Sequence, residues 1–178
     1  MSRRIVVAGI TGAGKTTVAR ALAAALDLPF VELDGFVEGP GWTVLPDFRE
    51  RTAEMVATDS WVTDNLWYPE VLDLLLGRAD TVVWLDLPRS VVVRRLVRRT
   101  LRRGLPPRPV LVNGNRERLW AVLLPSSPLR TAWSGHAHHR RRMEQQLAGF
   151  AGQVVRLRTP LEISAWLREN AARGVPDA

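Results

Sequence analysis

Residues 9–16 read GITGAGKT and match the pattern G-x-x-x-x-G-K-[ST], which is typical of loops that bind phosphate groups. The apolar run at residues 4–8 predicts a buried strand directly before this pattern. Apolar residues then recur at helical spacing over residues 15–26, which predicts a helix that begins inside the pattern. A strand, a glycine-rich turn and a helix in this order are the structural context that a phosphate-binding loop requires.

Each part of the pattern has a chemical reason. Glycines let the backbone wrap closely around a polyphosphate, and the helix N-terminus adds N–H groups and a partial positive charge. Lys15, the only lysine of the chain, is expected to reach the β- and γ-phosphates, and Thr16 to offer its hydroxyl to Mg²⁺. We therefore predict ATP and Mg²⁺ as cofactors. The predicted cofactor-binding residues are Gly9, Thr11, Gly12, Ala13, Gly14, Lys15, Thr16 and Thr17.

The composition excludes several classes of protein. A chain of 178 residues with 46% hydrophobic and 24% charged residues is typical of one globular domain, which we expect to cover residues 1–178. The absence of cysteine excludes a disulfide scaffold, a cysteine nucleophile and a thiolate metal site. No apolar run is long enough for a membrane span, and the run at residues 5–10 is too short for a signal peptide, so we expect a cytoplasmic protein.

Strands and helices alternate along the rest of the chain. Further strands are predicted at residues 30–33, 61–63, 81–85 and 154–157, and further helices at residues 47–58, 69–76, 88–103, 135–148 and 160–171. Residues 35–46 are expected to form a loop, and residues 110–135 to be irregular. This alternation predicts an α/β protein with a parallel sheet and helices on both faces, and ligands bind such sheets beyond the carboxyl ends of the strands.

Three carboxylates follow predicted strands. Asp64 is predicted to act on the Mg²⁺ side, although a turn or a helix cap also explains an aspartate there. Asp34 is predicted to accept the proton of an attacking hydroxyl or to orient the acceptor, although it also suits a turn with Gly35. Asp86 precedes Leu87-Pro88 and is more typical of a helix start.

Arginine is concentrated in one segment. Residues 89–142 contain 14 arginines and one acid, a formal charge of +13, whereas the rest of the chain carries −6. A solvated helix face explains part of this excess, but clustered like charges favour an anionic partner. We expect a lid at residues 105–135 and at least one contact to phosphate among Arg94, Arg98, Arg102, Arg116 and Arg130. The predicted catalytic residues are Lys15, Asp34, Arg94, Arg98, Arg116 and Arg130.

Three histidines and two tryptophans also carry predictions. His136, His138 and His139 lie beside three arginines and lack nearby acids, so we expect them on the surface rather than on a metal. Trp42 and Trp67 lie beyond predicted strand ends and are candidate walls of an acceptor pocket.

Several stretches together resemble the adenylate-kinase-like P-loop kinases, and among them the small DNA topology modulation proteins. The matching stretches are GITGAGKTT at 9–17, VELDGF at 31–36, PGW at 40–42, WVTDNLW at 61–67, ADTVVWLDLPR at 79–89, NGNRE at 113–117 and LRTAW at 129–133. The resemblance implies a three-layer fold with a five-stranded parallel sheet in the order 2-3-1-4-5 and an arginine-rich lid. It also implies phosphoryl transfer, with Asp64 beside the metal and Asp34 beside the acceptor.

The chain departs from the resemblance at two points. The usual Asp-Gly-Asn after the third strand is Asp64-Asn65 here, and the Asp-Gly-Phe-Pro-Arg stretch of adenylate kinases is absent. AMP is therefore not the expected acceptor.

Three functions remain open at this point. The first is an ATP-dependent, Mg²⁺-assisted kinase for a small acceptor such as a nucleotide, a nucleoside or another hydroxyl compound. The second is a nucleic-acid-binding ATPase that uses residues 89–142, which ranks lower because aromatic residues are not interleaved with the arginines. The third is a nucleotide-binding regulator without catalysis. We expect no membrane partner, and the sequence does not indicate an oligomeric state.

Overall fold

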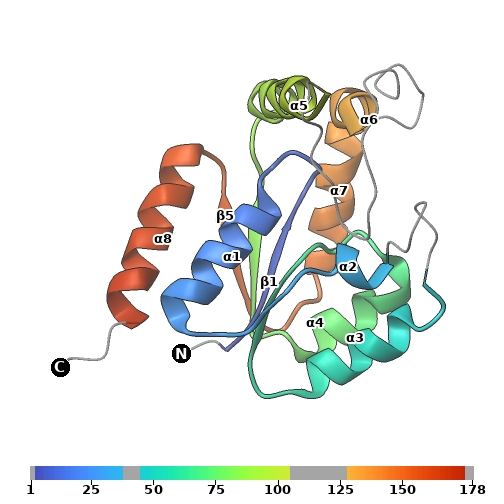
Figure 1. Ribbon diagram of the computed structural model, residues 1–178, viewed down its shortest axis with the longest axis vertical. Helices are drawn as coiled ribbons and strands as arrows, with labels where there is room; N and C mark the ends of the chain where they lie inside the picture. The colour runs from blue at the N-terminus through green and yellow to red at the C-terminus, as the bar shows by residue number, and fades with distance from the viewer. Residues whose placement is uncertain (1–2, 38–44, 105–127, 175–178) are drawn as a thin grey trace.

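Five parallel strands form one sheet in the computed structural model, which describes residues 3–37, 45–104 and 128–174 (Figure 1). The strands are β1 (Arg4–Gly9), β2 (Phe30–Val31), β3 (Trp61–Asp64), β4 (Thr81–Leu85) and β5 (Gln153–Leu157). Their order across the sheet is β2-β3-β1-β4-β5, and every neighbouring pair is parallel. The predicted fold class and strand order are therefore confirmed.

The helices cover both faces of this sheet. They are α1 (Lys15–Leu26), α2 (Asp34–Val37), α3 (Phe48–Ala57), the 3₁₀ turn η2 (Pro69–Val71), α4 (Leu72–Arg78), α5 (Arg89–Gly104), α6 (Pro128–Ser134), α7 (His136–Leu147) and α8 (Pro160–Gly174). Figure 1 shows α1 and α8 on one side of the sheet, and α3 and α4 on the other. None of the helices in the described ranges is long and apolar enough to cross a membrane.

The alternation of side chains along β1 divides the core into two layers. Ile5 and Val7 pack with the cluster that contains Leu22 of α1 and Leu96 of α5. Val6 and Ala8 point to the opposite face and pack with the cluster that includes residues of α3, α4 and α7. Because successive side chains of a strand point to opposite faces, an unbroken apolar strand is what a sheet with two covered faces requires.

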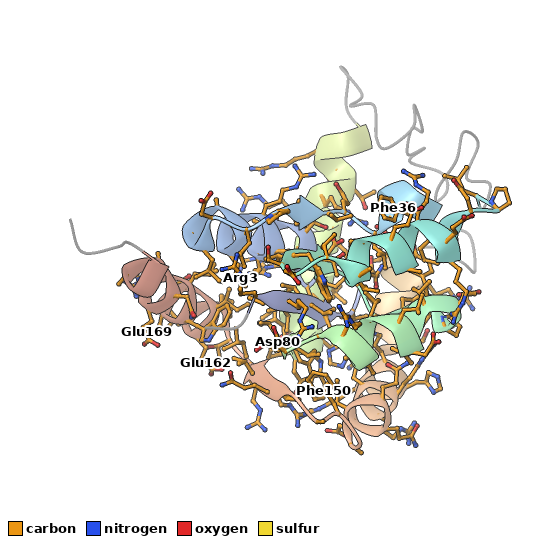
Figure 2. The ribbon with its side chains drawn as sticks, turned by 90° about the horizontal axis from the view of Figure 1, so that it is seen from below. Arg3, Phe36, Asp80, Phe150, Glu162 and Glu169 are labelled. Atoms are coloured by element: carbon orange, nitrogen blue, oxygen red, sulfur yellow. The ribbon has the colours of Figure 1, made fainter. Side chains whose placement is uncertain are left out.

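The amino ends of the strands are anchored by Asp80. Its carboxylate accepts hydrogen bonds from the backbone N–H groups of Arg3 at 3.2 Å and Arg4 at 3.0 Å, and it pairs with the Arg4 guanidinium at 2.5 Å. Figure 2 labels Arg3 and Asp80 at this end of the sheet. The pKa of Asp80 is lowered, first by the hydrogen bond from Arg4. These contacts hold β1 in register with β4, so the carboxyl ends of both strands meet beside residues 9–16.

The end of β2 and the residues that follow it differ from the sequence prediction. β2 ends at Val31 rather than at Leu33, because the Leu33 N–H donates to the Asp64 carboxylate at 3.2 Å instead of continuing the sheet. The predicted loop at residues 35–46 begins with the short helix α2.

The prediction that residues 110–135 are irregular was also partly wrong. This segment contains α6, whose Ala132 is fully buried in the core. The predicted lid at residues 105–135 therefore ends in a helix that packs on the body of the protein, and its part at 105–127 lies outside the described residues.

Candidate functional site

The phosphate-binding loop, residues 9–17, lies between β1 and α1 and packs against α5. Gly12 has a φ of +83°, and a Cβ atom there would lie 2.5 Å from Cγ of the buried Leu96. Gly14 has a φ of +96° and precedes α1 without a side-chain cap. Glycine is required at both positions because other residues rarely adopt such φ values, and at Gly12 a side chain would also collide with α5. The first turn of α1 is therefore left available to an anion.

A cleft of about 590 Å³ opens over this loop. It is lined by loop residues, by Val18 and Ala21 of α1, by Asp34 and Asp64, by two arginines of α5, and by residues of α8. A volume of this size is within the range of small-molecule sites. The lining residues are Thr11, Gly12, Ala13, Gly14, Lys15, Thr16, Thr17, Val18, Ala21, Asp34, Asp64, Arg95, Arg99, Pro160, Ile163, Ser164 and Leu167.

Lys15 is half-buried at the start of α1 and faces charges of both signs. Burial lowers its pKa, and the charge of Arg99 lowers it further, while Asp64 and Asp34 act in the opposite direction. Burial removes water that would stabilise the charged ammonium, and an anion beside Lys15 would replace that stabilisation. The electrostatics of Lys15 therefore favour a bound phosphate.

Asp64 ends β3 and is almost fully buried, with 1% of its surface exposed. Its Oδ2 accepts the hydroxyl proton of Thr16 at 2.5 Å, and its Oδ1 accepts the Leu33 N–H at 3.2 Å. Burial raises the pKa of Asp64, and the hydrogen bond from Thr16 opposes the shift. The structure thus joins the two predicted metal residues through a direct hydrogen bond.

This arrangement fits Mg²⁺ better than a metal held by the protein alone. Among the described residues, no group of three or more His, Cys, Asp or Glu side chains could hold a metal ion. Mg²⁺ characteristically keeps several waters and binds one or two protein oxygens together with phosphate oxygens. Thr16 and Asp64 supply oxygens of this kind at the edge of the phosphate-binding loop.

Asp34 begins α2 on the other side of the cleft. Its Oδ1 accepts hydrogen bonds from Asn65 Nδ2 at 3.1 Å and from the Tyr68 hydroxyl at 2.8 Å. Its charge acts on both Lys15 and Asp64. The structure therefore brings together residues from three separate segments of the sequence: Lys15 and Thr16, Asp34, and Asp64.

The arginines that line the cleft are not the ones predicted from the sequence. Arg95 and Arg99 of α5 line it, and Arg95 Nη1 donates to the carbonyl oxygen of Ala13 at 2.7 Å. The predicted Arg94 and Arg98 are exposed on α5 and are not among the lining residues. Arg95 and Arg99 flank the buried Leu96, so their position next to the apolar stripe of the helix was the signal that could have identified them.

Of the other two predicted arginines, only Arg130 is among the described residues, and it does not line the cleft. Arg130 is an exposed residue of α6 and lines a separate groove with Trp133. Arg116 lies outside the described residues, as does Trp42.

The α8 wall of the cleft was not predicted. Pro160, Ile163 and Leu167 come from the last helix and reach the loop because α8 packs along α1. The sequence predicted a helix at residues 160–171 but not its place beside the cleft. At the start of α8, the Thr159 hydroxyl accepts the Glu162 N–H at 3.1 Å, and the Glu162 carboxylate accepts the Arg158 N–H at 2.7 Å. Figure 2 labels Glu162 on this helix.

Asp86 has a structural role in an ion-pair cluster. Its Oδ2 pairs with Arg156 at 2.7 Å and with Arg140 at 3.2 Å. It is not among the residues that line the cleft. These ion pairs join the end of β4 to β5 and α7.

His138 is exposed, as expected, whereas His136 and His139 are partly buried and contact other residues. His136 Nε2 lies 2.8 Å from the carbonyl oxygen of Leu87, and His139 stacks on Trp67 with ring centroids 5.7 Å apart. Burial lowers the pKa of His139 to about 4, with a further contribution from the charge of Lys15. The imidazole of His139 is therefore neutral at neutral pH and within electrostatic range of the phosphate-binding loop.

Comparison with known proteins places this site in a family. The family model of shikimate kinase matches residues 11–56, which include most of the phosphate-binding loop and Asp34. The shikimate kinase of Novosphingobium aromaticivorans is 30% identical over 136 residues, which cover 65% of this chain and 67% of that protein. The shikimate kinase of Bradyrhizobium diazoefficiens is 42% identical over 53 residues, 30% of this chain, but this match spans only about a quarter of that protein's length, 26%.

The fold agrees with these matches. The structure of shikimate kinase from Acinetobacter baumannii in complex with shikimate superposes with a TM-score of 0.57 at 17% identity, covering 98% of this chain and 96% of that one. At this identity the superposition supports the fold alone, whereas the match to the Novosphingobium protein extends over two thirds of a curated relative. On the strength of that match, the chain belongs to the shikimate kinase family.

Proposed function

We propose that the protein is an ATP-dependent kinase that transfers the γ-phosphoryl group to a hydroxyl of a small acceptor with the help of Mg²⁺. The observation that carries this proposal is the meeting of Lys15, the Thr16–Asp64 pair and Asp34 at one cleft over the phosphate-binding loop. An ammonium, a metal-side hydroxyl and a carboxylate on the acceptor side are the groups that phosphoryl transfer requires. The shikimate kinase relatives support the same reaction class.

The lining of the cleft supports one orientation for ATP. The triphosphate would lie over residues 9–17, where the first turn of α1 and Lys15 supply N–H groups and positive charge. The adenosine end would lie between the α8 wall, which includes Ile163 and Leu167, and Arg95 on the opposite side. Mg²⁺ bound to Thr16 and to phosphate oxygens would neutralise charge on the transferred group.

The chemical step then uses Asp34. The acceptor hydroxyl passes its proton to the Asp34 carboxylate as its oxygen forms a bond to the γ-phosphorus. The bond between the γ-phosphorus and the bridging oxygen breaks, and ADP leaves with that electron pair. Lys15 stabilises the negative charge on the transferred phosphoryl oxygens throughout.

The acceptor belongs to small hydroxyl compounds, and shikimate is the first candidate because the relatives act on it by name. Asp34 suits this class because a carboxylate binds and deprotonates hydroxyl groups. The likeness to DNA topology modulation proteins stays a prediction from the sequence stretches, and we propose no DNA activity from it.

The test is ADP release by the purified protein with ATP, Mg²⁺ and a panel of acceptors that includes shikimate, other cyclic polyols, sugars and nucleosides. Lys15→Ala should lower turnover at least about 100-fold, because a charge that acts on the transition state is lost. Arg94→Ala is the matched control, since it removes an exposed cation outside the cleft. Equal turnover by the Lys15→Ala variant and the wild-type protein would refute the proposal.

A further inference from the structure

Both described hydrogen bonds to the Asp34 carboxylate converge on one of its oxygens. Asn65 Nδ2 donates to Oδ1 at 3.1 Å, and the Tyr68 hydroxyl donates to the same atom at 2.8 Å. A carboxylate oxygen offers about two lone-pair directions, so these donors occupy the acceptor capacity of Oδ1. They also fix the plane of the carboxylate, because rotation about its last torsion would break both bonds. Within residues 3–37, 45–104 and 128–174, Oδ2 accepts neither of these bonds, and it is therefore the oxygen that can receive a proton from an acceptor.

Asn65 is held in an uncommon conformation that suits this task. Its φ is +86°, and Asp27 is the only other non-glycine residue with a positive φ in the parts of the chain that the structure describes. Its N–H donates to the Val7 carbonyl at 2.9 Å, and its Oδ1 accepts the Trp67 N–H at 3.1 Å. Backbone strain of this kind persists where the surrounding structure enforces it, and it occurs at functional sites. Here it directs the amide nitrogen of Asn65 toward Asp34.

Tyr68 is fixed from behind by the core. Its ring packs edge-on against Phe48 of α3, with centroids 5.3 Å apart and an interplanar angle of 74°. Phe48 is itself buried, with 5% of its surface exposed. The hydroxyl of Tyr68 therefore reaches Asp34 from a rigid position, rather than from a side chain that could follow the carboxylate if it moved.

We propose that Asn65 and Tyr68 are positioning residues that hold Asp34 so that Oδ2 receives the proton of the acceptor hydroxyl. This inference rests on the proposed kinase function and adds how its general base is oriented. The balance of the step is unchanged: the proton moves from the acceptor oxygen to Oδ2, and the acceptor oxygen replaces the bridging oxygen on the γ-phosphorus. Neither Asn65 nor Tyr68 needs to touch the acceptor.

The first variant is Tyr68→Phe, which removes the hydroxyl and keeps the ring against Phe48. We expect kcat to fall about 10- to 100-fold, in the range of a general-base contribution. The Kd of ATP and the KM of the acceptor should change less than about threefold, because binding does not use this hydroxyl. Thr58→Val is the matched control, since it removes a hydrogen-bonded hydroxyl at the end of α3, away from the cleft.

The second variant is Asn65→Gly, which separates function from folding. Glycine adopts a positive φ without strain, so the fall in the urea midpoint of unfolding should be limited to the loss of the buried amide and of the hydrogen bond that it accepts from the Trp67 N–H, and the variant should stay folded under assay conditions. The amide donor is lost, however, so kcat should fall about 10-fold or more. A residue with only a structural role would change the midpoint and not kcat.

The decisive measurement repeats both variants in an Asp34→Asn background. If Asn65 and Tyr68 act through Asp34, their effects on kcat should shrink to less than about twofold there, because the base is already absent. Effects of equal size in both backgrounds, or wild-type kcat for both single variants, would overturn the inference while the kinase proposal stands. A wild-type protein that transfers phosphate to no acceptor would overturn the proposed function and this inference with it.

Discussion

Replacement of Gly12 by alanine should damage the contact between the phosphate-binding loop and α5. Gly12 has a φ of +83°, and a left-handed conformation costs alanine about 1–2 kcal/mol. The added Cβ would also lie 2.5 Å from Cγ, and 3.0 and 3.1 Å from the two Cδ atoms, of Leu96. Leu96 is 1% exposed and has little room to move, so overpacking adds about 1–3 kcal/mol. The total loss is about 2–5 kcal/mol of the free energy of unfolding.

Urea unfolding at constant pH measures this loss directly, and a thermal scan should show a fall of roughly 5–15 °C for a chain of this size. Gly77→Ala is the matched control, because a Cβ there meets nothing within 4 Å, so its midpoint should stay equal or rise slightly. The double variant Gly12→Ala with Leu96→Ala should recover about 1–3 kcal/mol relative to the sum of the single changes, since the new methyl group occupies vacated space. The reasoning is refuted if the free energy of unfolding of Gly12→Ala lies within about 0.5 kcal/mol of the wild-type value, which is about the error of such measurements. It is also refuted if the effects of the two changes in the double variant are strictly additive.

Three further predictions concern charge. Burial lowers the pKa of His139 from 6.5 to about 4, so the folded state binds this proton more weakly than the unfolded chain, and stability is lost as pH falls between these values. In urea titrations between pH 7 and pH 5, the free energy of unfolding of the wild-type protein should fall by about 1–2 kcal/mol more than that of His139→Phe, a range that allows for the partial exposure of His139. Equal falls for the two proteins would contradict this prediction. Burial raises the pKa of Asp64, so the folded protein loses stability as pH rises above the pKa of an unfolded aspartate and Asp64 ionises. Asp64→Asn should therefore unfold at an equal or higher urea concentration than the wild-type protein at pH 8, and this difference should shrink toward pH 4. ADP release by the same variant should fall about 100-fold. Arg99→Ala should weaken ATP binding about 10-fold in calorimetry because Arg99 lines the cleft, whereas Arg98→Ala, its exposed neighbour, should stay within twofold; equal effects would mean that α5 is oriented differently.

The elements that could be predicted are those with strong local signals. Residues 5–8 and 82–85 are unbroken apolar runs, and each lies in a strand that is buried on both faces. Residues 15–26 form a helix with the predicted bounds. β2 was predicted less well because the carboxylate of Asp64 on another strand sets its end. α6 was predicted less well because it packs against α5. Neither contact is encoded in the local sequence.

The site divides in the same way. Lys15 and Thr16 belong to a motif whose spacing alone places them at the start of a helix, and Asp34 and Asp64 follow strands that a parallel sheet brings to one edge. The order of β2, β3 and β1 makes these two carboxylates neighbours of the loop. The hydrogen bonds of Asp34 with Asn65 and Tyr68 depend on the positive φ of Asn65 and on the packing of Tyr68 against Phe48. No local sequence pattern predicts either feature.

By itself, the sequence determined the phosphate-binding loop, the alternation of strands and helices, and the kinds of charged group available for chemistry. The tertiary structure determined which arginines reach the cleft. Arginines occupy half of the surface of α5, and a pattern of charge along a helix does not set its rotation about its own axis. The packing of Leu96 against Gly12 sets that rotation, and so it turns Arg95 and Arg99 toward the cleft and leaves Arg94 and Arg98 exposed. Shape complementarity between a buried side chain and a glycine is a property of two distant segments together, so only the folded structure contains it.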